Sequence, residues 1–150
     1  MKALIQRVKS ACVQVDTHVV GQIDAGVLAY IGIGCDDDLA RAKKLIDKIL
    51  GYRIFENTTD PDKLGKLDKN VADIDGGLLL VSQFTLVANT HNGRRADFSP
   101  AMPPDDAKAL FGELVAYAKH KHPKVATGQF GADMRVASVN DGPINFILEV

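Results

Sequence analysis

The first fifteen residues alternate between apolar and polar side chains, and this alternation constrains the fold more than any other feature of the sequence. Leu4 and Val8 fall on one face of the pattern, and Ile5 falls on the other. A period of two residues is typical of a β-strand, so residues 2–15 are predicted to form one long strand. The polar residues 16–18 then turn the chain back into a second short strand, which predicts a hairpin.

Four further strands are predicted along the chain. An apolar run over residues 26–33 contains glycines that permit close backbone approach, and it predicts a buried central strand. Residues 78–81 predict another strand directly after two glycines. Near the end of the chain, residues 134–139 and 144–150 predict two short strands around a turn at residues 140–143, whose composition is Asn-Asp-Gly-Pro.

Two helices are predicted from apolar residues at helical spacing. The first covers residues 39–50, and Asp36, Asp37 and Asp38 before it offer an N-cap and a favourable charge for the first turn. The second covers residues 104–118 and begins at a proline followed by an aspartate. Because the strands outnumber the helices and do not alternate with them regularly, an α+β fold is favoured over a Rossmann-type α/β fold.

The chain has the size and composition of one globular domain. Its 150 residues suffice for a real core, and its 46% hydrophobic and 25% charged residues argue against disorder. No linker, repeat or low-complexity tract divides it. We therefore predict a single α+β domain over residues 1–150, with a mostly antiparallel sheet or partial barrel and two main helices.

Charge gives little information about partners. With a net charge of -1, the chain does not have the basic surface of a protein that coats nucleic acid through phosphates. Basic residues cluster over residues 93–95 and 119–124, but a solvated loop and a positively charged helix C-terminus account for them. Composition by itself therefore indicates neither an RNA nor a DNA partner.

Cysteine, histidine and hydropathy patterns indicate the compartment of the protein and whether metal or membrane contacts are expected. Cys12 and Cys35 are far apart and lack metal-binding or disulfide spacing, so a reduced intracellular pair is expected. The four histidines show no metal-ligand spacing, and no metal is predicted. The longest apolar run, residues 26–34, is too short to span a bilayer, and no signal segment is visible. A soluble cytoplasmic protein without a membrane partner is expected.

The segment Ser82-Gln83-Phe84-Thr85 follows directly after an apolar strand, where a scaffold can hold reactive groups rigidly. Thr85 is a candidate nucleophile, but a hydroxyl needs a base to activate it. The sequence shows no recognisable Ser/His/Asp order that would supply one. The backbone N–H groups of the segment are an equally good candidate for stabilising an ester oxyanion. An ordinary strand end, whose Ser and Thr satisfy local backbone groups, is the interpretation that the residues alone favour.

Two segments in the last quarter of the chain also leave alternatives open. Only about 5–6% of X–Pro bonds are cis, so a trans turn is the default at Gly142-Pro143. A cis bond there would aim two carbonyl oxygens outward as a fixed steric wall. The loop over residues 127–132 consists of small residues around Phe130, which either stacks on a nucleic-acid base or fills the core.

Together these segments resemble the D-aminoacyl-tRNA deacylase family, and the resemblance spans nearly the whole chain. Its motifs occur in order and in register: the opening strand at residues 3–8, Arg-Ile-Phe at 53–55, Ser-Gln-Phe-Thr at 82–85, Thr-Gly-Gln-Phe-Gly-Ala at 127–132 and Asn-Asp-Gly-Pro at 140–143. Any one of them could arise by chance, but the set in register is highly specific.

The resemblance implies an editing esterase that needs no cofactor and removes D-amino acids, and also glycine, from tRNA. It implies a homodimer that binds the 3′ acceptor end of aminoacyl-tRNA at the subunit interface. Gly142 and Pro143 would form a cis peptide that projects into the partner's site and excludes L-amino acids by a clash with their Cβ atom. Arg7 would pin the carbonyl groups of this peptide. Glycine has no Cβ, so the filter cannot reject it.

The resemblance also implies roles for the remaining motifs. The residues expected around the scissile ester are Ser82, Gln83, Phe84 and Thr85. Backbone amides near Phe84 and Thr85 would stabilise the oxyanion, and the 2′-OH of the terminal ribose would help to activate water. The residues expected to shape the adenosine pocket are Phe130, Gly131 and Ala132.

The chain departs from the family pattern in a few places. Asn145 stands where the family usually carries a hydroxyl, residues 65–71 differ from the usual pattern, and residues 94–99 lack a common proline. These departures concern tRNA contacts and loop geometry. Two other classes of function compete with the deacylase: a non-catalytic module that binds tRNA ends, and an esterase with Thr85 as its nucleophile.

Overall fold

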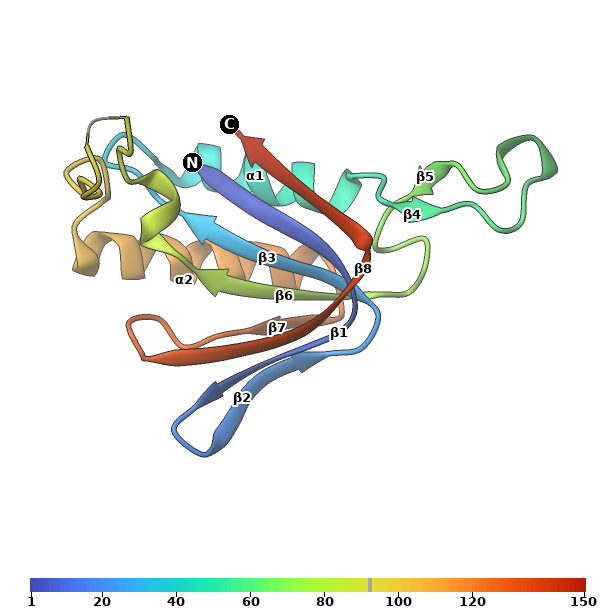
Figure 1. Ribbon diagram of the computed structural model, residues 1–150, viewed down its shortest axis with the longest axis horizontal. Coiled ribbons are helices and arrows are strands. Elements are labelled where there is room, and N and C mark those ends of the chain that lie inside the picture. The colour runs from blue at the N-terminus through green and yellow to red at the C-terminus, as the bar shows by residue number, and fades with distance from the viewer. Residues whose placement is uncertain (92) are drawn as a thin grey trace.

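The computed structural model describes residues 1–91 and 93–150. Its organising element is β1 (Lys2–Val15), which confirms the long strand predicted from the alternation. β1 is antiparallel to β2 (His18–Ile23), β3 (Gly26–Gly32) and β8 (Met134–Glu149). The first half of β1 pairs with β3 and the second half with β2, while β8 follows its other edge from end to end (Figure 1).

The sheet is mixed and curls on itself. Its order is β2-β1-β3-β6-β7, in which β6 (Gly77–Ser82) is parallel to β3 and to β7 (Val125–Thr127). The outer strands of this order contact each other, and a Cβ on Gly21 in β2 would overlap the carbonyl oxygen of Thr127 in β7. The predicted partial barrel is confirmed, with two parallel pairs beside its antiparallel ones.

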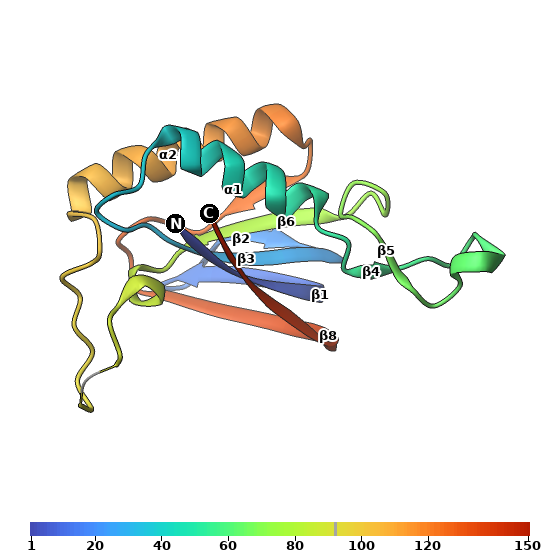
Figure 2. The same ribbon diagram turned by 90° about the horizontal axis from the view of Figure 1, so that it is seen from above.

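Helices α1 (Leu39–Gly51) and α2 (Pro104–Lys121) cover one face of the sheet, as Figure 2 shows, and both were predicted. Side chains of β6 alternate between two cores: Leu78 and Leu80 pack beneath the helices, whereas Leu79 and Val81 face the interior of the curl. Each such fully buried side chain stabilises the fold by about 1.5–3 kcal/mol. Both cores therefore hold the strand that leads into Ser82.

The aspartates before α1 do not act as a group. Asp38 is the N-cap, and its carboxylate accepts a hydrogen bond from the amide of Arg41 at 2.8 Å. Asp37 is instead buried and pairs with the α-amino group of Met1 at 2.6 Å. The prediction that all three aspartates serve the helix start is thus corrected, because the fold brings the first residue of the chain beside Asp37.

The segment from Met134 to Glu149 forms one strand rather than the two that were predicted. Its pairing with β1 is nevertheless broken where the turn was expected. Gln6 pairs with Asn145 and Val8 pairs with Asn140, so residues 141–144 bulge out of the ladder opposite a single residue of β1. β8 bends sharply in Figure 1, and this bend separates its two halves.

Short elements complete the chain. β4 (Phe55–Glu56) and β5 (Leu67–Lys69) form a hairpin that carries the 3₁₀ helix η1 (Pro61–Lys63) and projects from the body (Figures 1 and 2). A second 3₁₀ helix, η2 (Phe84–Val87), follows β6 after one residue. Residues 57–66 therefore connect the two strands of a small hairpin.

Candidate active site

A mostly apolar pocket of about 610 Å³ opens where β6 ends. Its walls come from the ends of β3 and β6, the segment before α2, the first turn of α2, and the chain between β7 and β8. Residues 82–84 and 130–132 line it together, although nearly fifty residues separate them in the sequence. Six of the seven residues predicted to surround the ester or shape the adenosine site therefore share one cavity, and Thr85 lies one residue beyond its lining.

The local structure of residues 82–85 explains how this segment faces the pocket. The amide of Gln83 donates to the carbonyl of Ile31 at 2.7 Å, which extends the β3–β6 pairing by one residue. Phe84 and Thr85 then begin η2, so their amides have no acceptor within that helix. The Gln83 side chain donates from Nε2 to the hydroxyl oxygen of Thr85 at 2.6 Å.

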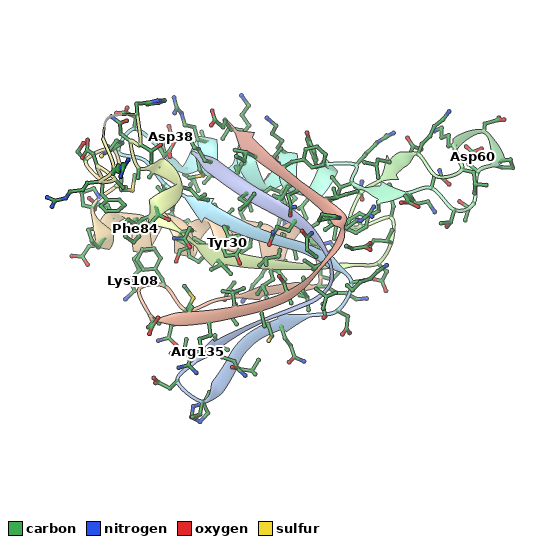
Figure 3. All side chains as sticks on the ribbon, viewed as in Figure 1. Tyr30, Asp38, Asp60, Phe84, Lys108 and Arg135 are labelled. Atoms are coloured by element: carbon green, nitrogen blue, oxygen red, sulfur yellow. The ribbon has the colours of Figure 1, made fainter. Side chains whose placement is uncertain are left out.

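The pocket lining lacks ionisable side chains. None of the described residues that line it is an acid, a base, a cysteine or a tyrosine. Tyr30, labelled in Figure 3, lies outside the lining, and burial raises the pKa of its phenol, so it stays protonated near neutral pH. The side chains therefore present hydroxyl and amide groups but no proton acceptor that is ionised at neutral pH.

The loop between β7 and β8 closes the other side of the pocket. Gly131 has a φ of 75°, a left-handed conformation that glycine adopts without strain. The ring of Phe130 lies 5.9 Å from that of Phe111 in α2. Phe130 is only half-buried and lines the pocket, so it contacts the core and also presents an aromatic surface to the cavity.

Gly142 and Pro143 lie in the bulge of β8, and the peptide bond between them is cis. Arg7, on β1 opposite the bulge, is only 6% exposed. Its Nε donates to the carbonyl oxygen of Asp141 at 3.3 Å and pairs with the Asp141 carboxylate at 3.0 Å, while Nη1 donates to the carbonyl of Ile54 at 3.0 Å. Among the described contacts, Arg7 thus bonds the residue before Gly142 rather than the carbonyls of Gly142 and Pro143.

The bulge and the pocket lie apart within one chain. Arg7 is in register with Val27 and, through it, with Leu78, whereas Ser82 is in register with Ile31. Leu78 and Ser82 are four residues apart on β6, which corresponds to about 13 Å along the strand. Figure 3 agrees, with Phe84 on the opposite side of the view from the bend of β8. Neither Arg7, Gly142 nor Pro143 lines the pocket.

Several pocket residues were missed in the sequence. Phe98 packs against Phe84 with ring centroids 5.1 Å apart and the rings tilted by 58°, and both rings line the cavity. Residues 101–104 and Ala107 form the wall beside α2. Pro104, followed by Asp105, predicted a helix start and nothing more. Since the wall forms only when the chain before α2 folds back along β3, the sequence carries no local signal for it.

The described residues contain no group of three His, Cys, Asp or Glu side chains placed to hold a metal ion. Among the same residues, no helix is long and apolar enough to cross a membrane.

The fold and the pocket define a class of protein: a curled mixed sheet with two helices on one face and an apolar pocket without ionisable lining. The family model described as D-Tyr-tRNA(Tyr) deacylase matches residues 4–149. The chain therefore belongs to the D-Tyr-tRNA deacylase family, and the resemblance seen in its motifs is confirmed.

Individual relatives agree with this assignment. The chain is 68% identical to a D-aminoacyl-tRNA deacylase of Psychrobacter arcticus, over 100% of the chain and 99% of the relative. A solved structure described as c-Myc DNA Unwinding Element Binding Protein is 34% identical, with a TM-score of 0.91 and coverage of 100% and 99%. A probable eukaryotic D-amino acid tRNA deacylase shares the fold at a TM-score of 0.85 and 16% identity, with coverage of 99% and 98%.

Proposed function

We propose that this protein hydrolyses the ester bond between a D-amino acid and the terminal adenosine of tRNA, releasing the free D-amino acid and tRNA. Membership of the family and the high identity to a relative named D-aminoacyl-tRNA deacylase support the reaction. The observation that carries the proposal is the joint lining of one pocket by residues 82–84 and 130–132. An aromatic wall and a strand end with free amides together suit an aminoacyl-adenosine.

The chemistry is proposed to depend on the backbone and the substrate rather than on a side-chain base. A threonine hydroxyl needs a base to become a nucleophile, but the hydroxyl of Thr85 contacts an amide, the Nε2 of Gln83. The amides of Phe84 and Thr85 at the start of η2 are the proposed oxyanion donors, and one good donor lowers a barrier by about 3–4 kcal/mol in other hydrolases. The 2′-OH of the terminal ribose is proposed to activate the attacking water.

Chiral selection is proposed to come from a second copy of the chain. The bulge that carries Gly142 and Pro143 lies about 13 Å along the strands from Ser82, so a subunit cannot easily present it to its own pocket. Val139 and Ile147, on either side of the bulge, are 57% and 69% exposed, and a dimer contact over β8 would cover them. The backbone of the bulge would then exclude an L-Cβ while accepting D-amino acids and glycine.

The proposed partners are the 3′ acceptor end of aminoacyl-tRNA and a second copy of the chain, in the cytoplasm, where aminoacyl-tRNA is used. One relative is named for binding a DNA element, but with a net charge of -1 a DNA-coating role for this chain is not proposed.

The decisive experiment compares D-Tyr-tRNA, L-Tyr-tRNA and Gly-tRNA as substrates, with release of the amino acid as the measurement. We expect cleavage of the D-Tyr and Gly esters and sparing of the L-Tyr ester. Equal rates for D-Tyr and L-Tyr would contradict chiral editing. Binding of D-Tyr-tRNA without turnover would indicate the non-catalytic module, and a covalent adduct on Thr85 would indicate the threonine esterase. Light scattering should give the mass of a dimer.

A further inference from the structure

The chain between η2 and α2 carries two arginines, Arg94 and Arg95, that the proposed function does not use. This segment projects from the body (Figure 2), and its later residues, Phe98 and residues 101–103, line the pocket. Its base is closed by two hydrogen bonds between Asn89 and Asp97, from the amide of each to the carbonyl of the other, at 2.8 and 3.0 Å. Gly93 turns the loop with a φ of 72°. The two arginines are therefore presented on a closed loop rather than on a free tail.

The positive charge of this loop is not neutralised locally. The ion pairs of the described residues include those of Arg7, Arg41 and Arg53, but none involves Arg94 or Arg95. Both arginines are exposed residues.

Among the described contacts, the one acidic residue between Ala88 and Ser99, Asp97, does not pair with the arginines. The carboxylate of Asp97 accepts from the amide and from the hydroxyl of Ser99, each at 2.9 Å. These two hydrogen bonds lower the pKa of Asp97, so it is ionised while it is held toward Ser99. The arginines thus keep their charge available for an external anion.

The loop is joined directly to the rim of the pocket. Phe98 follows Asp97, lines the cavity and packs against Phe84 with its ring tilted. The two rings are 45% and 58% exposed, so the aromatic pair is open to solvent at the mouth. Arg95 lies three residues before Phe98, so its Cα is at most about 11 Å from that of Phe98. An anion bound by the arginines would therefore sit next to the entrance of the pocket.

We propose that Arg94 and Arg95 bind phosphates of the unpaired nucleotides that precede the terminal adenosine of tRNA. This inference rests on the proposed function, which places the adenosine in the pocket and the preceding nucleotides at its mouth. Guanidinium groups bind phosphate through two parallel hydrogen bonds, and cations beside exposed aromatic rings are typical of single-strand binding. Because the chain as a whole is slightly acidic, this local pair supplies the electrostatic attraction.

The test uses the full-length double variant Arg94→Ala/Arg95→Ala and two substrates, D-Tyr-tRNA and D-tyrosyl-adenosine, which has no phosphate. We expect KM for D-Tyr-tRNA to rise about tenfold with kcat nearly unchanged, and no change on D-tyrosyl-adenosine. Each lost contact to a single strand removes about 0.7 from the slope of log affinity against log salt, so the slope should fall by about 1.4.

The matched control is Lys119→Ala/Lys121→Ala, which removes the same two charges from the last turn of α2. These lysines lie about 15 residues along the helix from Pro104 at the pocket, or about 22 Å. The control variant should match the wild type on both substrates and keep its salt slope. An equal effect of the control would indicate a general charge effect and would overturn the proposal.

Other outcomes are equally decisive. If the double variant hydrolysed both substrates more slowly, the loop would only hold the pocket in shape. If it hydrolysed both at the wild-type rate, the arginines would make no phosphate contact. Either result overturns the proposal. A change of oligomeric mass in the double variant would assign the arginines to the partner subunit and also overturn it.

Anisotropy with an unacylated RNA 3′-end oligonucleotide separates this inference from the proposed function. Weaker binding by the double variant would support the phosphate contact even if the wild type hydrolysed no ester. Equal binding by the wild type and the double variant would overturn it even if hydrolysis were normal.

Discussion

The pocket and the bulge of β8 differ in what the chain presents to a ligand. The pocket presents side chains around a cavity, with aromatic rings on two sides. The bulge presents backbone: residues 141–144 leave the ladder opposite Arg7, whose buried guanidinium bonds the carbonyl of Asp141. The first region suits recognition of a base and an ester, whereas the second suits a steric test that ignores the identity of the side chain.

The pocket and the bulge also lie apart in space. Because the bulge lies four register positions from Ser82, we propose that a substrate in the pocket meets the bulge of another subunit. Substitutions in the two regions should therefore fail in different ways: bulge variants should lose activity, selectivity or stability, and variants at the pocket should lose affinity or turnover.

The largest effect is expected at Gly142. Its φ of 116° is a conformation that L side chains rarely adopt, and an added Cβ would lie 2.8 Å from Cγ1 of Ile144. Gly142→Ala should therefore displace the bulge and reduce hydrolysis of D-Tyr-tRNA about 100-fold, measured as kcat/KM.

Gly112→Ala is its control, because Gly112 is exposed in α2 and an added Cβ meets nothing within 4 Å. That variant should keep full activity and gain about 0.5–1 kcal/mol of stability, measured by urea unfolding. Wild-type activity and selectivity in Gly142→Ala would remove the bulge from the mechanism.

Arg7→Ala should have the next largest effect, on stability. Arg7 is buried, and its loss leaves the carbonyl of Ile54 without its donor and the carboxylate of Asp141 with only Lys9, at 3.3 Å. The free energy of unfolding should fall by about 2–3 kcal/mol.

The exposed pair of Arg53 and Asp68 is the matched comparison for Arg7, and Arg53→Ala should cost less than about 1 kcal/mol. Urea unfolding measures both variants. If the two losses were equal, Arg7 would not be a structural anchor of the bulge.

Phe130→Ala should weaken substrate binding. The ring lines the pocket, and stacking of a base on an aromatic ring contributes about 1–3 kcal/mol, so KM should rise roughly tenfold or more. Phe130 also packs near Phe111, so Phe130→Leu serves as a second variant that restores apolar volume without the aromatic face. Recovery of stability without recovery of KM supports stacking, while full recovery of both would reduce Phe130 to a core residue.

Thr85→Ala should have the smallest effect. It removes the acceptor for the Gln83 amide, a hydrogen bond that contributes about 0.5–1.5 kcal/mol, so kcat should fall roughly three- to tenfold. Single-turnover hydrolysis of D-Tyr-tRNA measures this directly. Near-complete loss of hydrolysis with intact substrate binding would restore Thr85 as the nucleophile.

Much of the fold could be predicted from local patterns. The alternation over residues 2–15, the helical spacing over residues 39–50 and the proline at the start of α2 each predicted an element that the structure contains. The continuity of β8 could not be predicted, because Asn140, Gly142 and Pro143 have the composition of a turn. Pairing with β1 on both sides of the bulge holds the two halves in one strand.

The site could be predicted only where it has motifs. Residues 82–85 and 130–132 stood out by their resemblance to a family, and the structure brings both segments to the pocket or to its edge. Phe98 and the wall before α2 had no such signal, since their place depends on hydrogen bonds such as that from the amide of Met102 to the carbonyl of Ile33. The burial of Asp37 likewise depends on where the start of the chain comes to lie.

The sequence by itself determined most of the long strands, both α-helices, the family and the motifs, because periodicity and turn chemistry act over a few residues. Only the tertiary structure decided that two distant motifs line one pocket without an ionisable group, and that the bulge lies four register positions away from Ser82. The physical reason is register: the long-range pairing of β1, β3, β6 and β8 fixes which side chains share a row and which lie four residues apart.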